Sequence, residues 1–268
     1  GPAHQKTTFY LGRFVTDDGV EGWSAFPASG RERAGIGDAI ANLFLGQNPE
    51  DIDLLSERIR IMAVSGNYNW WLEPALWDIK AKNAGLPLYK LLGGKHDRLK
   101  LYASSGELRD PAARRDEAEA RLAEGFDTFK IRVHDWDEKV DIEHITDVAT
   151  HMQGRMKIAV DCNQAFRLTQ NAAAPLWSLD RAKRFADAAA DVELAWVEEP
   201  LFGEWHEEMA ELSAYSRVPI SGGELHVAGY YELARMVKMR CYDIFQPDAM
   251  WAGGIKQCLD IARLCREA

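Results

Sequence analysis

Acidic residues recur at or just after the ends of short apolar runs in the second half of the chain. They are Asp161, Glu198 with its neighbour Glu199, Glu224 and Asp248. An apolar run predicts a buried strand, and a buried strand seldom ends in carboxylates unless a cation meets them. Each acid taken alone could also be a solvated loop residue or a helix N-cap. Their repetition favours one shared site.

Three carboxylates in one site would repel one another and raise their pKa values unless a divalent cation lay between them. Asp161, Glu198 and Glu224 therefore predict a metal site. Oxygen ligands, with no pair of Cys or His residues nearby, favour Mg²⁺, with Mn²⁺ as the alternative. Magnesium keeps positions open for a substrate oxygen, so the predicted site is catalytic rather than structural.

The elements that must bring these acids together are strands and helices that alternate from Arg98 onward. The predicted strands cover 99–104, 127–133, 156–161, 194–198, 217–222 and 241–246. The predicted helices cover 111–124, 137–153, 179–190, 205–215, 228–239 and 254–266. Six βα units in series predict a parallel sheet with helices outside. No glycine-rich nucleotide-binding motif follows a strand, and acids at several strand ends favour an α/β barrel over a doubly wound sheet.

The number of units falls short of a complete barrel. Such a barrel needs eight units in roughly 250 residues, whereas residues 98–268 supply about six. Either the chain is a fragment, or the barrel is open or completed by a partner. We favour a fragment, because an unfinished barrel would expose two long apolar strand edges.

Residues 1–97 predict a smaller α+β module. Residues 7–26 form two β-prone runs around Asp18-Gly19, which is typical of a β-hairpin. Helical patterns follow at 35–45, 49–64 and 69–83. In the second of these helices, Asn48 is the predicted N-cap and Pro49 lies in the first turn.

The composition excludes several classes of protein. A formal net charge of −10 over 268 residues argues against binding to nucleic acid or anionic membranes, which need clustered Lys and Arg. The four cysteines lack a zinc or disulfide spacing, so we expect reduced, buried thiols, with Cys162 and Cys241 in strands. No apolar run is long enough to span a membrane and no signal-peptide pattern occurs. We expect a cytoplasmic protein.

Several motifs together resemble the mandelate racemase branch of the enolase superfamily. They are residues 16–23, 74–80, 85–94, 160–163, 197–200, 222–224, 246–248 and 253–255, and the resemblance runs from about residue 7 to the end. It implies a capping domain, residues 1–97, over a modified βα barrel of which residues 98–268 are part. It also implies Mg²⁺ held by Asp161, Glu198 and Glu224, removal of the proton α to a substrate carboxylate, and stabilisation of the enediolate by the metal.

The matching residues for the family's Lys-x-Lys base motif are Lys130 and Arg132. Alternation places both, with His134, on one face of the second barrel strand. Arginine stays protonated, so Arg132 can bind a carboxylate but is a poor base, which argues against a racemase with two bases. Lys130, its pKa lowered by the guanidinium and the metal, could take the proton, and so could His134. His134 could equally be a solvated loop residue.

Other site residues follow from the resemblance or from position. Asp248 resembles the family aspartate that orients a histidine on the following strand, and that histidine would lie beyond Ala268. His226 is a second candidate at the rim, or a loop residue. We expect Asn163 to contact the substrate and Glu199 to support the metal ligands.

The interval between Asp161 and Glu198 is longer than one βα repeat and leaves a loop at 164–177. This loop could line a polyhydroxylated substrate, or it could be a packing or subunit-contact loop. Its candidate side chains are Arg167, Thr169, Gln170, Asn171 and Trp177.

These observations predict a Mg²⁺-dependent lyase that removes water from a sugar acid. The alternative within the family is a racemase, epimerase or cycloisomerase that uses the same enolate. An alternative of another class is a metal-binding fragment without catalysis, since the partner histidine and two barrel units are missing. We expect a small-molecule substrate, no nucleic-acid or membrane partner, and assembly with copies of the same chain.

Overall fold

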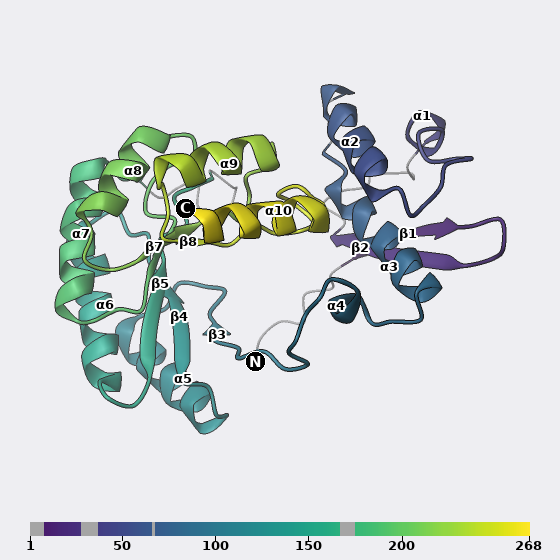
Figure 1. Cartoon of the computed structure of the whole chain (residues 1–268). Helices are drawn as coiled ribbons and strands as arrows, with labels where there is room; N and C mark the ends of the chain where they lie inside the picture. Colours follow the sequence, from purple (N-terminus) through teal and green to yellow (C-terminus); the bar gives the residue numbers. More distant parts are fainter. Residues whose placement is uncertain (1–7, 28–36, 66–67, 167–174) are drawn as a thin grey trace. The chain divides into compact units, whose positions relative to one another are not determined.

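The structure is a computed structural model that describes residues 8–27, 37–65, 68–166 and 175–268 (Figure 1). The chain forms two compact units. The N-terminal unit comprises residues 1–98 with the later segments 226–231 and 247–263. The sheet unit comprises residues 99–225, 232–246 and 264–268. The N-terminal unit therefore includes residues from far along the sequence.

The N-terminal unit contains the antiparallel hairpin that the sequence predicts. Strands β1 (Phe9–Val15) and β2 (Glu21–Pro27) pair along their full lengths. The turn between them closes through the N–H of Gly19, which donates to the carbonyl oxygen of Thr16 at 2.9 Å. Gly19 adopts a φ of 87°, a conformation that costs glycine little.

Short helices follow the hairpin. They are α1 (Asp38–Ala41), α2 (Ile52–Met62), α3 (Glu73–Asn83) and α4 (Leu88–Leu91), with single 3-10 turns at Ala63–Ser65 and Trp70–Leu72. The helix predicted over 35–45 is confirmed only in part: α1 covers Asp38–Ala41, and residues 42–46 form turns. Helix α3 packs so closely on β2 that a Cβ atom on Gly22 would lie 2.0 Å from the carbonyl oxygen of Ala75. This contact requires glycine in the strand.

Helix α2 begins later than predicted. Its N-cap is Asp51, whose Oδ1 accepts the N–H of Leu54 at 3.1 Å. The predicted cap, Asn48, instead accepts the N–H of Glu50 at 3.0 Å in the preceding turn. Asn and Asp side chains can both cap a helix. Asp51 is the cap here because it directly precedes Ile52, the first buried residue of the helix.

The core of the N-terminal unit joins residues from both ends of the chain. Phe26, Leu55, Trp70, Trp71 and Leu76 belong to its buried cluster. Packed against this cluster are Met250, Trp251, Ile255 and Leu259, the last two from α10 (Gly254–Glu267). The ring centroids of Phe26 and Trp251 are 4.7 Å apart. The segment 247–263 is therefore part of this core.

Glu73, at the start of α3, is fully buried and joins α3 to α10. Its carboxylate accepts the hydroxyl of Ser56 at 2.5 Å and the N–H of Lys256 at 3.3 Å. Gly253 and Gly254, where α10 begins, have no side chain that could cap the helix. Glu73 therefore satisfies a backbone donor in the first turn of α10.

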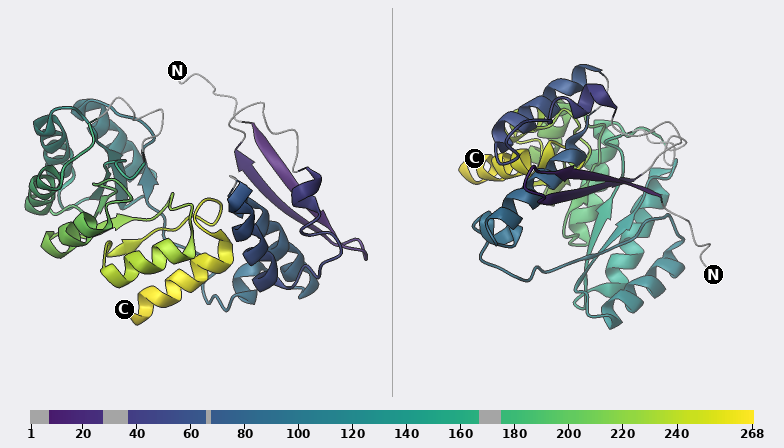
Figure 2. Two further views of the ribbon diagram at one scale, coloured as in Figure 1. Left: turned by 90° about the horizontal axis from the view of Figure 1, so that it is seen from above. Right: turned by 90° about the vertical axis from the view of Figure 1, so that its right-hand side faces the viewer.

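In the sheet unit, six parallel strands pair in sequence order. They are β3 (Ala103–Ser104), β4 (Thr128–Arg132), β5 (Lys157–Asp161), β6 (Val197–Glu198), β7 (Ile220–Gly222) and β8 (Ile244–Phe245). The helices between them are α5 (Pro111–Ala123), α6 (Glu138–Met152), α7 (Leu179–Asp191), α8 (His206–Tyr215) and α9 (Tyr230–Met239). Figure 2 shows these helices outside the strands. The predicted partial βα barrel with an α+β N-terminal part is confirmed.

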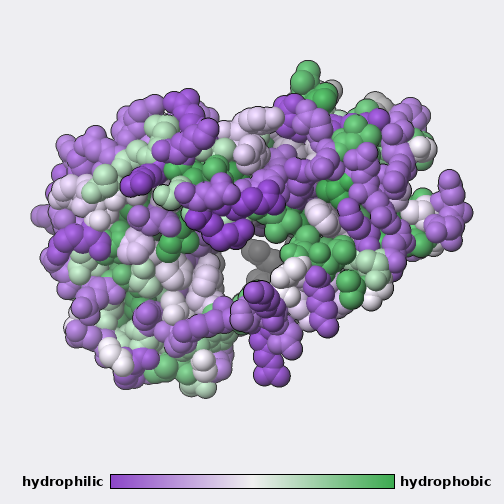
Figure 3. Space-filling model, in the orientation of Figure 1, coloured by the Kyte–Doolittle hydropathy of each residue, from purple (hydrophilic) through white to green (hydrophobic). Residues whose placement is uncertain are grey.

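Side-chain caps and amphipathic faces explain where these helices lie. Asp110, Asp137 and Ser178 cap α5, α6 and α7 by accepting a backbone N–H in the first turn of each. The left edge of Figure 3, where α6 and α7 lie, is mainly hydrophilic. Ile145 of α6 and Phe185 of α7 lie on the inner faces of these helices and are buried.

Some strands are shorter than predicted. Of the predicted strand 194–198 only Val197 and Glu198 are regular, although the N–H of Ala195 still donates to Ile158 of β5 at 2.8 Å.

Within the described residues, no helix combines the length and the apolar character that a membrane crossing requires.

The cysteines are free thiols. Cys162 and Cys241 are buried, directly after β5 and shortly before β8 rather than inside strands. Cys258 and Cys265 lie in α10 and are half-buried, so the prediction of full burial is wrong for these two.

Candidate metal and catalytic site

Three charged side chains lie side by side across the carboxyl ends of neighbouring strands. In the register of the sheet, Arg132 of β4 is opposite Asp161 of β5, and Asp161 is opposite Glu198 of β6. Both carboxylates are almost fully buried, with 1% and 2% of their surfaces exposed. The sheet thus brings together the first two acids of the predicted ligand set.

Two cations from β4 balance these carboxylates. The Nζ atom of Lys130 lies 2.6 Å from Glu198 Oε1 and 3.7 Å from Asp161 Oδ2. Arg132 Nη1 lies 3.0 Å from Asp161 Oδ2. Burial and the charge of Glu198 raise the pKa of Asp161, and the two cations offset part of this rise. The strand ends therefore concentrate charge that only nearby opposite charge can compensate.

Lys130 is a counter-ion in this arrangement. Burial lowers its pKa, but Asp161 and Glu198 raise it by more, so the net shift of the pKa is upward. The lower pKa predicted for Lys130 as a base depends on the metal as well as on Arg132, and it stays a prediction. The upward shift has a plain cause, since Nζ lies 2.6 Å and 3.7 Å from two buried carboxylates.

The carboxylate of Glu199 is also buried beside these two acids. Its Oε1 is buried and makes no hydrogen bond to any residue in the described ranges. Burial and the charges of Asp161, Glu198 and Glu224 raise its pKa well above the usual range. The residue also adopts a left-handed φ of 47°, which is rare outside glycine and asparagine and which its neighbours must stabilise.

Backbone hydrogen bonds hold Glu199 in that conformation. Its N–H donates to Ser221 of β7 at 2.9 Å, and its carbonyl oxygen accepts the N–H of Gln164 at 2.9 Å. Asn163, next to Gln164, is also left-handed, with a φ of 47°. The N–H of Asn163 donates to Asp161 Oδ1 at 2.9 Å, and its side-chain oxygen accepts a hydrogen bond from Arg132. The loops after β5 and β6 are thus fixed against each other.

A pocket of about 570 Å³ opens beside these residues. It is lined by Gly106, Glu107, Leu108, Arg132, His134, Asn163, Phe166, Glu199, Glu224 and Leu225. Five of the predicted site residues, one of them the metal-ligand candidate Glu224, therefore share one cavity. Residues 106–108 form a wall of the pocket that is not among the predicted site residues. Their position could have indicated them, because this segment follows the first predicted barrel strand as the predicted acids follow later strands.

His134 lies in the pocket wall and is half-buried. Burial lowers its pKa below 6.5, and the nearby positive charge of Arg132 lowers it further. Its imidazole is therefore neutral near pH 7 and able to accept a proton. Its Nδ1 is buried and makes no hydrogen bond within the described part of the chain.

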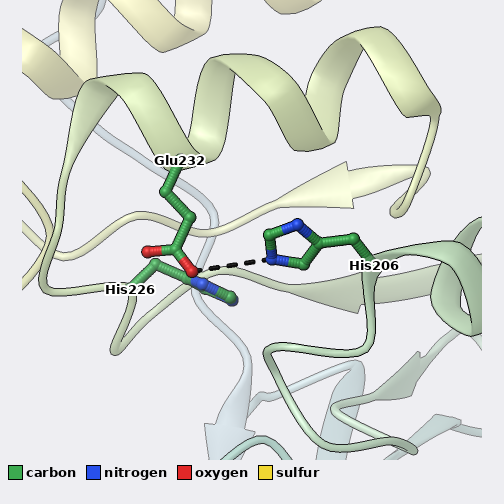
Figure 4. Close-up of side chains that lie close together, drawn as sticks. All are labelled: His206, His226 and Glu232. Atoms are coloured by element: carbon green, nitrogen blue, oxygen red, sulfur yellow. Dashed lines mark ion pairs between the residues drawn. The ribbon is translucent and has the colours of Figure 1, made fainter.

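Lys130, Asp161 and Glu198 lie outside the lining of this pocket, and so do three further predicted site residues. Trp177 is fully buried, and its ring packs 4.9 Å from that of Phe185. His226, on the loop between β7 and α9 (Figure 4), is also buried and belongs to the N-terminal unit. Asp248 belongs to that unit too, and its Oδ1 accepts the N–H of Met250 at 2.6 Å. The roles of His226 and Asp248 in catalysis stay predictions.

Two further points concern the surroundings of the pocket. The predicted loop residues Arg167, Thr169, Gln170 and Asn171 lie outside the described residues. His206 Nε2 and Glu232 Oε1 form an ion pair at 3.6 Å (Figure 4) that joins the start of α8 to α9, and neither residue lines the pocket.

Residues 3–93 match the family described as mandelate racemase / muconate lactonizing enzyme, N-terminal domain, and residues 113–268 match the enolase C-terminal domain-like family. The chain belongs to the mandelate racemase branch of the enolase superfamily. These matches confirm the family that the sequence motifs predict.

Two relatives are named for reactions of D-galactonate and of D-galactarolactone. A D-galactonate dehydratase from Ralstonia nicotianae is 32% identical over 265 residues, which are 93% of this chain and 66% of the relative. A D-galactarolactone cycloisomerase from Agrobacterium fabrum is 28% identical over 92% of this chain and 65% of its own. The chain thus spans about two thirds of the length of these relatives.

A solved structure of a dehydratase has the same fold. The L-talarate dehydratase from Polaromonas sp. JS666, complexed with Mg and L-glucarate, is 28% identical and has a TM-score of 0.82. The similarity covers 97% of this chain and 73% of that one.

Proposed function

We propose that this chain removes water from a sugar acid in a Mg²⁺-dependent reaction. The observation that carries the proposal is the buried group of acids at the strand ends, Asp161, Glu198 and Glu199, beside a pocket that also holds Glu224. The names of the relatives, which include a dehydratase of D-galactonate, support a sugar acid as the substrate.

The residues present fit a divalent cation. A buried carboxylate oxygen of Glu199 lacks a hydrogen-bond partner among the described residues, and three further acids raise the pKa of this group. A hard cation with oxygen ligands supplies the positive charge that such a group requires. We assign Asp161, Glu198 and Glu224 as its ligands, with Glu199 beside them. When bound, the ion would stabilise the negative charge that develops on the substrate carboxylate.

Arg132 is the proposed anchor for the substrate carboxylate. Its Nε donates to the carbonyl oxygen of Ser105 at 2.8 Å, and its Nη1 contacts Asp161 and Asn163. The guanidinium is thus held in one orientation while it lines the pocket. Because it stays protonated, it can bind an anion throughout the reaction and cannot act as the base.

His134 is the proposed base. Its neutral imidazole would take the proton from the carbon next to the substrate carboxylate. The hydroxyl on the next carbon would then leave with its bonding electrons, gain a proton and depart as water. A double bond would remain between the two carbons, in an enol that rearranges to a 2-keto acid.

A cycloisomerase is the second candidate function. It would share the same proton removal, and one relative bears that name at 28% identity. The two functions differ in what happens to the enolate after the proton is removed. A dehydratase releases water, whereas a cycloisomerase keeps all atoms of its substrate.

A screen of acid sugars with Mg²⁺ present tests both functions. A 2-keto-3-deoxy acid as product indicates dehydration, and an isomer of the substrate indicates the alternative. Glu198→Gln should abolish turnover and weaken Mg²⁺ binding measured by calorimetry. Glu207→Gln, on the exposed face of α8, is the matched control and should change neither quantity.

Two outcomes would contradict the proposal. Turnover that does not respond to Glu198→Gln or to removal of Mg²⁺ would exclude this site. Tight Mg²⁺ binding without turnover of any acid sugar would favour a metal-binding chain without catalysis.

A further inference from the structure

A buried ion pair lies behind the pocket wall that carries His134. Asp141 of α6 and Arg181 of α7 are 3% and 8% exposed, and Arg181 Nη2 lies 2.7 Å from Asp141 Oδ2. In the sequence, both residues look like the exposed charged residues of an amphipathic helix. Their burial raises the question of what the pair holds.

The pair holds the backbone of the loop after β4. Arg181 donates to the carbonyl oxygens of Asp135 and Trp136, at 2.7 Å and 3.2 Å. Asp141 Oδ1 accepts the N–H of Asp135 at 2.9 Å. Both backbone polar groups of the residue next to His134 are thus bonded to the same ion pair.

No hydrogen bond from a described residue fixes the imidazole of His134. Its Nδ1 is buried and makes no hydrogen bond within the described ranges of the chain. The position of the ring in the pocket wall therefore depends on the backbone that carries it. That backbone is the segment that Asp141 and Arg181 hold.

The same arginine also reaches the loop after β5. The guanidinium of Arg181 lies 4.5 Å from the centroid of the Trp177 ring, a cation–π contact. The N–H of Trp177 donates to Gln164 Oε1 at 3.0 Å, and Gln164 is bonded in turn to the backbone of Cys162 and of Glu199. One cation thus touches two loops at the carboxyl ends of neighbouring strands.

Stability alone does not explain such a pair. A buried ion pair often stabilises a fold no better than apolar residues of the same volume. Helices α6 and α7 are already joined by an exposed pair, in which Arg184 bonds both carboxylate oxygens of Glu138 at 2.7 Å. The buried pair differs from the exposed one in its bonds to the loop.

We propose that Asp141 and Arg181 are positioning residues that hold His134 in the wall of the pocket through the backbone of residues 135 and 136. The part of this inference that concerns turnover rests on the proposed function. The part that concerns the loop does not.

Hydrogen exchange in the full chain tests the loop, with Arg181→Met compared to Arg184→Met. Arg181→Met should raise the exchange rate of the Asp135 amide about tenfold, since the loop loses its two hydrogen bonds from Arg181. It should also shift the His134 imidazole resonances, assigned through His134→Gln. Arg184→Met, which breaks the exposed pair between the same helices, should change neither quantity.

Turnover gives a second, separate measurement. On an accepted acid sugar, Arg181→Met should lower kcat about tenfold or more while KM changes less than about threefold, because misplacing a base affects the chemical step more than binding. Arg181→Lys should recover part of the loss. It also keeps the test decisive if the methionine variant fails to fold.

Three results would overturn the inference. If the Asp135 amide exchanges at the same rate in Arg181→Met and Arg184→Met, the buried pair only joins the two helices and does not hold the loop. Wild-type exchange and wild-type kcat in both Arg181→Met and Arg181→Lys would show that the bonds to the loop have no role. Unchanged imidazole resonances of His134 in Arg181→Met would show that the ion pair does not determine the position of the imidazole. If no acid sugar is turned over by the wild type, the proposed function fails, while the exchange data still decide this inference.

Discussion

Lys130 tests the charge balance at the strand ends most directly. Its Nζ lies 2.6 Å from Glu198 Oε1, and the two side chains are only 7% and 3% exposed. Removing one partner of a buried ion pair costs roughly 3–5 kcal/mol, because the other charge stays buried without compensation. Lys130→Met keeps much of the side-chain volume and removes the charge. We expect the free energy of unfolding to fall by about 3 kcal/mol in metal-free buffer.

Urea unfolding at pH 7, with and without Mg²⁺, measures this effect. Mg²⁺ should stabilise Lys130→Met more than the wild type, since Lys130 and the proposed ion compete for the same carboxylates. At free Mg²⁺ about 100 times its dissociation constant, binding adds about 2.7 kcal/mol to the free energy of unfolding. Arg184→Met, which breaks an exposed pair, is the control and should cost about 0–1 kcal/mol.

Either of two results would refute this reasoning. Equal losses of stability in Lys130→Met and Arg184→Met would show that the buried carboxylates do not depend on Lys130. Equal stabilisation of Lys130→Met and the wild type by Mg²⁺ would show that Glu198 is not a ligand of the ion.

Three further predictions concern neighbouring side chains. His134→Gln should lower kcat by roughly 10²–10⁴ with unchanged circular dichroism, and the acid limb of the wild-type pH–rate profile should lie below pH 6.5, since burial and Arg132 lower the pKa of His134. Glu199→Gln should raise stability in metal-free buffer by about 1 kcal/mol, because it removes a buried charge that other acids repel, and calorimetry should show weaker Mg²⁺ binding. Burial raises the pKa of Asp141 from 3.8 to about 6, so the folded state keeps a proton that the unfolded state releases between these pH values. Stability should therefore fall as pH rises through this range, by up to about 3 kcal/mol, and urea unfolding of Asp141→Asn should show a smaller fall.

The sheet and the row of charges across it could be predicted because both depend on local patterns. Alternating βα units fix a parallel sheet, and equal positions at successive strand ends meet at one edge. Asp161 and Glu198 are adjacent for this reason. The prediction needed only the lengths of the repeats and the position of each acid in its strand.

The groups that hold the pocket in place could not be predicted in this way. Asp141 and Arg181 lie in amphipathic helices among many exposed charges, and only the packed structure shows that these two are buried. Glu107 reaches the pocket from a loop whose course no periodicity determines. The start of α2 was misplaced because Asn48 and Asp51 are equally good caps in the sequence, and the tertiary contacts of the helix decide between them.

The core of the N-terminal unit has a consequence for synthesis of the chain on the ribosome. Phe26 and Trp71 pack with residues of the segment 250–259, which is made roughly 150 residues after the first 98. At about 5–20 residues per second, this segment follows after on the order of ten seconds or more. During this interval the apolar surface that Trp251, Ile255 and Leu259 later cover is open to water. Until the segment with α10 has been made, this uncovered surface favours aggregation of the nascent chain.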